Sequence, residues 1–212
     1  MIKIHRSRPH QEKSGEDLYF SVGGFVFEVV KIFFLAFIII VPIRMFLFQP
    51  FFVQGASMEP NFEDNQYLII GEFGYKTVPV GIGGASLTTV KSFKDIQRQT
   101  VIVFRYPLDR SKFFIKRVIG LPGEKIEIRD NQVKIYNAQN PDGLVLDESR
   151  YLPPANRTTG DLVVTLKDDE YFVMGDNRRF SSDSRSWGPI NKTDVVGIVL
   201  LRAWPFNQLA IY

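Results

Sequence analysis

Residues 113–120 read FFIKRVIG, a run of apolar and β-branched side chains that ends at a glycine. Short runs of this kind, separated by glycine, proline or asparagine, are typical of β-strands joined by turns. We expect the same structure at residues 67–72, 100–107, 124–130, 132–136, 170–175 and 194–204. No long amphipathic helical pattern follows residue 50. The sequence therefore predicts a mainly β domain built from antiparallel strands.

Two segments interrupt the expected strands. Residues 137–167 are polar and contain turn-forming residues throughout, so we expect an excursion from the core there. Residues 81–84 read GIGG, which we expect to separate strands as a turn. Asp130 and Asn131 lie between two expected strands and suit a hairpin turn.

A strongly apolar segment near the N-terminus, residues 25–48, reads FVFEVVKIFFLAFIIIVPIRMFLF. Its uninterrupted centre is too short to span a bilayer, whereas the whole segment reaches the ~20 residues that spanning requires. A buried core helix and a cleaved signal peptide are the alternatives, but bulky Met45 and Phe46 fit poorly with a cleavage site. We expect a transmembrane helix in which Glu28 and Lys31 share one side and pair.

The distribution of cations predicts the orientation of this helix. Lys and Arg cluster in residues 1–24, and after Arg44 no further Lys or Arg appears until residue 76. Under the positive-inside rule, residues 1–24 form a cytoplasmic tail. Residues 51–212 then form an extracytoplasmic β domain.

Composition excludes several kinds of active site. The chain has no cysteine, which rules out a thiol nucleophile, disulfides and a Cys-ligated zinc. Both histidines, His5 and His10, lie in the expected cytoplasmic tail, so a Ser-His-Asp triad cannot form in the β domain. Its acidic residues are scattered, so we expect no metal and no other cofactor. The net charge of +3 is spread along the chain and gives no footprint for nucleic acid.

A serine hydrolase without histidine needs another base, and a lysine can serve when burial lowers its pKa. Lys116 is the candidate, because strand alternation places Phe114 and Val118 on its own face. The opposite face of this run is also apolar, so alternation places Lys116 beside apolar groups without establishing its burial. A lysine that snorkels to the surface is the alternative.

Ser57 is the candidate nucleophile. It lies in QGASMEP, residues 54–60, shortly after the apolar segment and therefore near the expected membrane surface. Taken alone, a serine in this setting is more typical of a turn or a helix cap. Residues 175–189 read GDNRRFSSDSRSWGP and offer acids, arginines and hydroxyls that can orient an amine, although a capped polar loop would look the same.

Four segments, taken in order, resemble bacterial type I signal peptidases, also called leader peptidases. They are QGASMEP, DIQRQTVIVFRYP at residues 95–107, FIKRVIGLPGE at residues 114–124, and GDNRRFSSDSRSWGP. The resemblance covers most of residues 25–205. It implies a membrane-bound serine endopeptidase that removes N-terminal signal peptides from secreted preproteins. It also implies a coiled antiparallel β-sheet with a small inserted cap.

The resemblance implies a role for each residue that matches a family motif. Ser57 corresponds to the nucleophile and Lys116 to the unprotonated general base. Ser181 corresponds to a serine that orients the lysine. Two ion pairs are implied as structural support of the site: Asp183 with Arg185, and Asp176 with Arg117.

The chain departs from the family pattern at two places beside this site. Gly55 stands where some members carry a serine whose hydroxyl serves the oxyanion hole. The oxyanion would then rest on the Ser57 backbone N–H and another donor. Arg179 and Phe180 stand where members often have Asp and Asn, which changes the local charge and bears on substrate preference.

The resemblance also implies partners and a location. The expected substrates are preproteins with small residues at −1 and −3, in the A-x-A manner. The lipid bilayer is the other expected partner, with no obligate protein partner. The expected location is the cytoplasmic (inner) membrane of a bacterium, crossed once. Two alternatives stay open: a Ser/Lys processing protease for one dedicated substrate, and a tethered β-domain that binds extracytoplasmic partners without catalysis.

Overall fold

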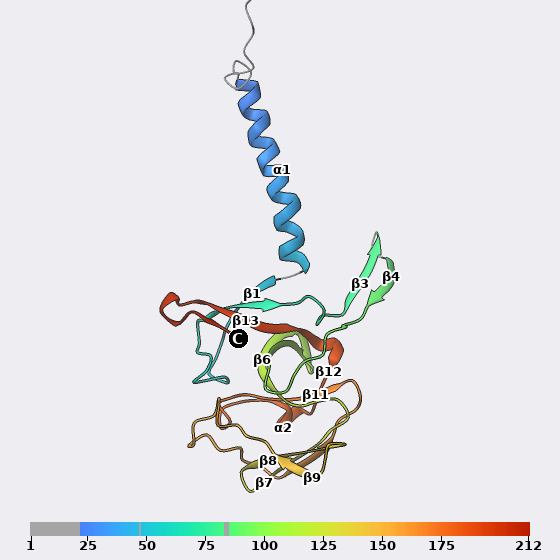
Figure 1. Ribbon diagram of the computed structural model, residues 1–212, viewed down its shortest axis with the longest axis vertical. Helices are drawn as coiled ribbons and strands as arrows, with labels where there is room; N and C mark the ends of the chain where they lie inside the picture. Colours follow the sequence, from blue (N-terminus) through green and yellow to red (C-terminus); the bar gives the residue numbers. More distant parts are fainter. Residues whose placement is uncertain (1–21, 47, 83–84) are drawn as a thin grey trace, which may run out of the picture. The chain divides into compact units, whose positions relative to one another are not determined.

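The computed structural model describes residues 22–46, 48–82 and 85–212 (Figure 1). The chain divides into two compact units, Met1–Arg44 and Met45–Tyr212. The first contains most of helix α1, and the second contains all the strands.

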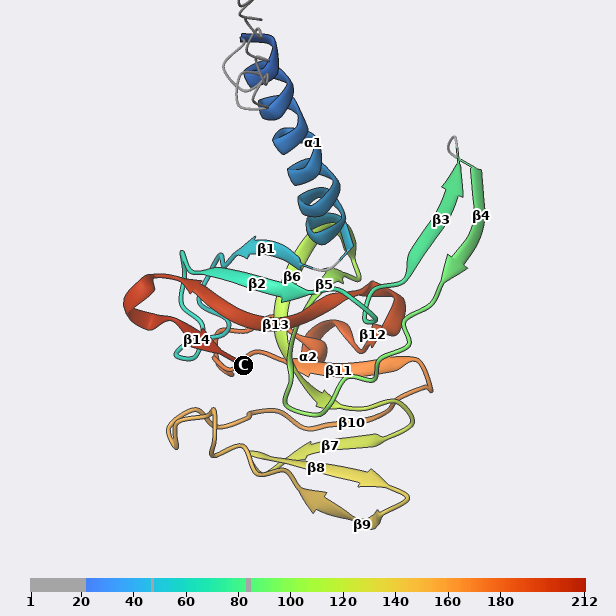
Figure 2. The same cartoon turned by 45° about the horizontal axis from the view of Figure 1, so that its top comes forward.

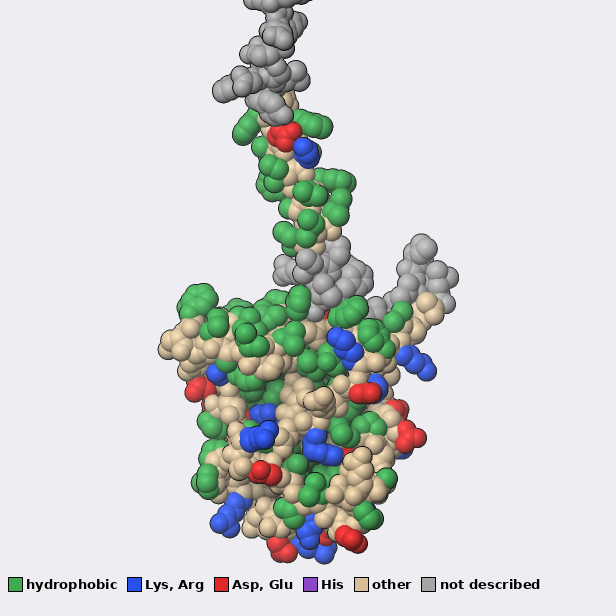
Figure 3. Space-filling view, in the orientation of Figure 1, with side chains coloured by type: hydrophobic (Ala, Val, Ile, Leu, Met, Phe, Trp, Pro, Cys, Tyr) green, Lys and Arg blue, Asp and Glu red, His purple; other side chains and the backbone are tan. Residues whose placement is uncertain are grey.

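Helix α1, Val22–Phe46, is apolar enough over Gly23–Val41 to cross a membrane, and none of that stretch is buried. Its length of about 37 Å, at ~1.5 Å per residue, exceeds the hydrocarbon core of a bilayer. Lys31 Nζ lies 3.5 Å from Glu28 Oε2, as the spacing predicts. Apart from this pair, the helix exposes mainly apolar side chains over Gly23–Val41 (Figure 3), which suits lipid rather than water.

The prediction that the apolar helix ends at Phe48 is wrong. The helix ends at Phe46, and Phe48 begins strand β1, Phe48–Phe52. β1 pairs antiparallel with β2, Tyr67–Gly71, and the ring of Phe52 packs 4.9 Å from that of Tyr67. The strand forms because residues 48–52 pair with a segment distant in sequence. Apolar composition alone does not distinguish such a strand from a continued helix.

The larger sheet has eight antiparallel strands. Figure 2 shows three of them, β1, β2 and β13, side by side. The order of the sheet is β1-β2-β13-β5-β6-β11-β12, and β14 pairs with β13. The remaining bounds are β5 Val101–Tyr106, β6 Asp109–Gly120, β11 Glu170–Met174, β12 Ile190–Asn191, β13 Val195–Trp204 and β14 Ala210–Ile211. Register shifts interrupt β5, β6, β11 and β13. Such irregularities bend and twist strands, which gives the sheet its coiled form.

A second sheet of four strands has the order β10-β7-β8-β9. Its strands are β7 Lys125–Arg129, β8 Gln132–Asn137, β9 Asn140–Val145 and β10 Leu162–Thr165. Residues 137–167, which we expect to form an excursion from the core, contain β9 and β10, two strands that the sequence did not predict. Only alternate residues of β10, such as Leu162 and Val164, pack against the core. The apolar pattern that would predict this strand from the sequence is therefore weak.

A separate hairpin joins β3, Val78–Ile82, to β4, Ala85–Val90. The turn expected at residues 81–84 is only partly right, because Gly81 and Ile82 pair with Ser86 and Ala85 as strand residues. Residues 83 and 84 lie outside the described residues. Elsewhere Asp130 and Asn131 both have positive φ, 52° and 60°, as a type I′ hairpin turn between β7 and β8 requires.

The helical elements of the β domain are short. They are α2 Ser184–Trp187, η2 Lys192–Asp194 and η3 Phe206–Gln208. The Asp183 side chain caps α2 by accepting from the Arg185 backbone N–H. The core consists of three apolar clusters, and β6 contributes to all three. Ile115 packs against the first cluster, Ile119 lies in the second, and Val118 lies in the third. β6 is thus held from both faces, which fixes the side chains it presents.

Candidate active site

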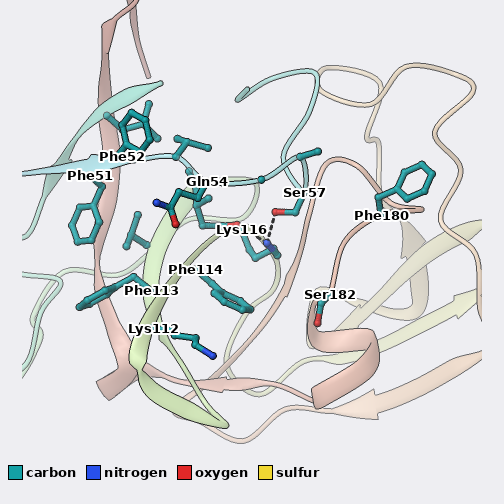
Figure 4. Close-up of a pocket in the computed structure, with 16 residues that line it drawn as sticks. Phe51, Phe52, Gln54, Ser57, Lys112, Phe113, Phe114, Lys116, Phe180 and Ser182 are labelled. Carbon is teal, nitrogen blue, oxygen red and sulfur yellow. Dashed lines mark hydrogen bonds between the residues drawn. The ribbon is translucent and has the colours of Figure 1, made fainter. Parts of the chain in front are cut away.

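Lys116 and Ser57 meet in a largely apolar cleft, between Phe114 on one side and Phe180 on the other (Figure 4). Lys116 lies on β6 opposite Ile102 of β5, and only 3% of its surface is exposed. Its Nζ lies 2.7 Å from Ser57 Oγ and 2.9 Å from the Ile115 carbonyl oxygen. The Phe114 ring centroid is 5.4 Å from the same nitrogen. The snorkelling alternative for Lys116 is therefore wrong.

Burial lowers the pKa of Lys116 from its ordinary value to about 8, and the negative charges of Asp183 and Asp176 oppose that change only in part. A lysine with this pKa is unprotonated in a substantial fraction of molecules at mildly alkaline pH. Its lone pair then faces the Ser57 hydroxyl. The geometry and the pKa together suit proton transfer from serine to lysine.

A turn after β1 holds Ser57. Its fold is set by backbone bonds between Val53 and residues 65–66, and by a bond of 2.7 Å from the Gly55 N–H to Asp64 Oδ1. Met58 is 1% exposed and anchors the turn in the core. Gly55 has φ of 86°, a left-handed conformation that favours glycine. Because its N–H is already bound to Asp64, Gly55 contributes shape rather than a donor.

Within the described residues, the Ser57 backbone N–H has no hydrogen-bond acceptor. Its carbonyl oxygen accepts from the Asn177 N–H at 3.0 Å, and Asn177 Nδ2 donates to the Ala56 carbonyl at 3.0 Å. Asn177 therefore joins the serine turn to the 175–189 loop. The unpaired N–H of Ser57 is available to a developing oxyanion.

Arg117 follows Lys116 on β6 and forms an ion pair with Asp176. Its Nε and Nη2 donate to the two carboxylate oxygens at 2.8 and 2.5 Å. Asp176 is fully buried and also accepts from Asn61 Nδ2 at 2.9 Å. The pair ties β6 to the start of the 175–189 loop.

Asp183 and Arg185 form the second ion pair. Arg185 Nη2 lies 2.8 Å from Asp183 Oδ2, and that oxygen also accepts from the Gly175 N–H at 3.1 Å. Burial raises the pKa of Asp183, but the hydrogen bonds and charge of Arg185 bring it below its usual value. Gly175 itself allows a close approach, because a Cβ there would collide with Ser181 Oγ and the Ser57 carbonyl.

Ser181 lies against this glycine, and its hydroxyl helps to lower the pKa of Asp183, although it makes no hydrogen bond of normal geometry within the described part of the chain. The acceptor that orients Lys116, besides Ser57, is the Ile115 carbonyl. A backbone carbonyl has no sequence signature, which is why sequence reasoning missed it.

Glu148 is a further residue that sequence reasoning missed. It pairs with the fully buried guanidinium of Arg178, with Nη1 at 2.9 Å from Oε2. Arg178 also donates to the Gly175 carbonyl and to Thr158. A residue from the segment between β9 and β10 thus supports the loop behind Ser57. Thirty positions separate Glu148 from Arg178, and no local pattern links them.

The cleft beside Ser57 has a volume of about 690 Å³. Its lining is mainly apolar and comes mostly from β1, the serine turn and β6. Leu68 of β2, Val103 of β5, and Phe180 and Ser182 of the 175–189 loop complete it. A serine and a buried lysine facing such a cleft form the active site expected of a serine hydrolase that uses no histidine.

Comparison with known proteins identifies the family. The model for signal peptidase, peptidase S26, matches residues 26–204, so the chain belongs to that family. Signal peptidase IB of Staphylococcus aureus is 29% identical over 187 residues, covering 82% of this chain and 86% of that protein. Signal peptidase I V of Bacillus subtilis is 31% identical over 171 residues, covering 76% and 89%. The predicted family is confirmed.

Among solved structures, a signal peptidase I from Enterococcus faecalis V583 is 33% identical. It aligns with 50% of this chain and 98% of its own, with a TM-score of 0.41. The expected mainly β fold after one apolar helix is confirmed.

Proposed function

We propose that this chain removes N-terminal signal peptides from secreted preproteins, with Ser57 as the nucleophile and Lys116 as the general base. The observation that carries the mechanism is the 2.7 Å approach of Lys116 Nζ to Ser57 Oγ, in a place where burial lowers the lysine pKa to about 8. Family membership supports the reaction class.

The first half of the reaction forms an ester. Neutral Lys116 takes the Ser57 proton while Oγ bonds to the carbonyl carbon of the −1 residue, and the carbonyl electron pair moves onto oxygen. The Ser57 N–H donates to that oxyanion together with a second donor. The carbon–nitrogen bond then breaks, and the Lys116 ammonium gives its proton to the leaving amine.

The second half regenerates the enzyme. Lys116, neutral again, takes a proton from water as the water oxygen bonds to the acyl carbon. The ester bond to Ser57 breaks, and Oγ recovers its proton from Lys116. The products are the free signal peptide carboxyl end and the mature amino terminus, and no cofactor is consumed.

The supporting residues act on this pair through the backbone. The pair of Asp176 with Arg117 ties the 175–189 loop to β6 beside Lys116, and the pair of Asp183 with Arg185 stabilises that loop internally. Gly55 shapes the serine turn for the oxyanion site. The lysine-orienting role of Ser181 stays a prediction, supported by its place against Gly175.

The substrate and setting complete the proposal. The preprotein enters the cleft in extended form, with small residues at −1 and −3. Helix α1 spans the cytoplasmic membrane of a bacterium, with residues 1–24 inside and residues 51–212 outside, so the lipid bilayer is a partner. The exposed apolar surface of α1 supports the spanning of a membrane, and the cation distribution supports the orientation.

The test is cleavage of a preprotein with an A-x-A site by the full chain in detergent. Wild type should cut after the second small residue, whereas Ser57→Ala and Lys116→Ala should show no cleavage. Ser149→Ala, at an exposed position away from the cleft, is the matched control and should keep full activity. Cleavage by folded Ser57→Ala at the wild-type rate would refute the mechanism.

A further inference from the structure

Phe180 has the most exposed aromatic ring of those that line the cleft, with 74% of its surface in solvent. Figure 4 shows it on the other side of Ser57 from Phe51, Phe113 and Phe114. The cleft therefore has two unequal parts, a long apolar one along β1 and β6 and a short one that ends at Phe180.

The backbone that carries Phe180 is fixed. The Phe180 N–H donates to the Asn177 carbonyl at 3.0 Å, and Asn177 is bonded to both Ala56 and Ser57. The neighbouring Arg178 is 2% exposed and its carbonyl accepts from Arg185 Nη2 at 2.7 Å. An exposed ring on so constrained a loop is held at a set position relative to Ser57.

Such a ring is well suited to recognition. Its contact with an apolar side chain removes water from both surfaces, at ~25 cal/mol per Å² of apolar area. A side chain with two rotatable bonds on a fixed backbone loses little entropy when it binds. Arg179 adds a cation at the same rim, with its guanidinium carbon 6.0 Å from the ring centroid.

The direction of the substrate follows from the two parts of the cleft. The signal peptide side of the cleavage site is extended and apolar, and the long part along β1 and β6 accommodates it. The leaving amine begins the mature protein, and its chain continues from Ser57 toward the short part. This side reaches Phe180.

We propose that Phe180 is a specificity residue for the mature part of the preprotein, selecting an apolar or aromatic side chain at +1 or +2. The inference rests on the proposed function. It adds a determinant of substrate specificity on the leaving-group side of the cleavage site, and Phe180 supplies that determinant.

The experiment compares matched peptide substrates with the full chain in detergent. The peptides share one A-x-A site and differ only at +1 or at +2, where they carry Ala, Ser, Leu or Phe. Wild type should cleave the Leu and Phe peptides with kcat/KM about three- to tenfold above that for Ala at one of the two positions, the range expected for one aromatic contact.

Phe180→Ala should remove this preference, so that the ratio of kcat/KM for the Leu or Phe peptide to kcat/KM for the Ala peptide falls to about 1. Phe180→Tyr should retain the preference. The matched control is Phe206→Ala, which removes a ring of the same 74% exposure that does not line the cleft, and its preference should equal that of wild type.

Equal losses on all peptides in Phe180→Ala, or an unchanged preference, would overturn the inference while cleavage by wild type still supports the proposed function. No cleavage of any peptide by folded wild type would instead overturn the proposed function itself, and the inference with it.

Discussion

Lys116 combines two properties that oppose each other in a protein core. Its 3% exposure lowers the pKa to about 8, which supplies a neutral amine for Ser57. The same burial makes the ammonium form costly in the folded state. At residue scale, activity and stability therefore depend on pH through one group.

The activity should rise with pH through the Lys116 pKa of about 8, because the neutral amine is the base. Lys116→Arg should be inactive at every pH, since a guanidinium stays protonated. The measurement is kcat/KM on an A-x-A peptide from mildly acidic to alkaline pH. Lys167→Arg, an exposed exchange outside the cleft, should keep the wild-type profile. A flat wild-type profile would point to another base.

Lys116→Met should be inactive but more stable than wild type near neutral pH. The folded pKa lies below the ordinary 10.5, so the unfolded chain binds more protons between about 8 and 10.5 and wild-type stability rises with pH there. Below pH 8 the buried Lys116 ammonium lowers the free energy of unfolding by at most about 3 kcal/mol, at 1.36 kcal/mol per pKa unit. The exchange to Met removes this cost. Thermal unfolding in detergent should show a Tm gain that shrinks above pH 8. A constant gain would contradict this assignment.

At the scale of elements, the segment between β9 and β10 supports the loop behind Ser57. Glu148 is the carboxylate partner of Arg178, whose side chain is fully buried. Removing one partner of a buried pair leaves an uncompensated charge, and the cost is far above that of a surface pair. The segment between β9 and β10 thus bears on the active site through Arg178, which contacts both Glu148 and Thr158.

Glu148→Ala should lower the free energy of unfolding by about 3 kcal/mol. Glu148→Ala combined with Arg178→Met should be more stable than Glu148→Ala alone, because no buried charge is left unpaired. Denaturant unfolding of the two variants measures the difference. Lys167→Ala, which breaks an exposed pair with Glu170, should cost under about 1 kcal/mol. Equal costs for both single variants would contradict the role of Glu148.

Gly175→Ala should reduce kcat/KM by at least about tenfold, because the added methyl collides with Ser181 Oγ and with the backbone carbonyl of Ser57. A peptide assay with a circular-dichroism check of folding measures this loss. The same exchange at Gly23, an exposed position in α1, is the control and should be tolerated. Wild-type activity in Gly175→Ala would show that the serine turn has room to move.

The strands that sequence reasoning finds are those whose pattern is local. β5, β6, β7, β8, β11 and β13 each bury several apolar side chains, and their runs are visible in the sequence. β1 and β10 owe their strand character to distant partners, β2 and β7. At the site, motif order leads to Ser57 and Lys116, whereas the contacts of Asp64 and Glu148 depend on tertiary packing.

At the scale of the whole molecule, the anchor and the β domain are separate compact units. Confining enzyme and substrate to one membrane raises their effective concentration, so the active site can work with modest affinity. The anchor therefore contributes to encounter, and the β domain to chemistry.

A chain that begins at residue 45 should cleave a soluble A-x-A peptide with kcat/KM within about threefold of the full chain. On a preprotein in liposomes it should be slower by at least about tenfold, because the shared surface is lost. Parallel assays of both proteins on both substrates measure the two ratios. Equal losses on peptide and preprotein would show that the anchor supports the fold of the β domain.

The hydrogen bond from the Asn177 N–H to the Ser57 carbonyl joins two residues that the ribosome adds at well-separated stages of synthesis. Until residue 177 and the strands around it have emerged, nothing holds the serine turn against the loop that supports it, since this contact closes a long stretch of chain. A nascent chain that has not reached residue 177 therefore lacks the hydrogen bond that joins the serine turn to this loop. The contact between Ser57 and Asn177 is therefore among those completed late in biosynthesis.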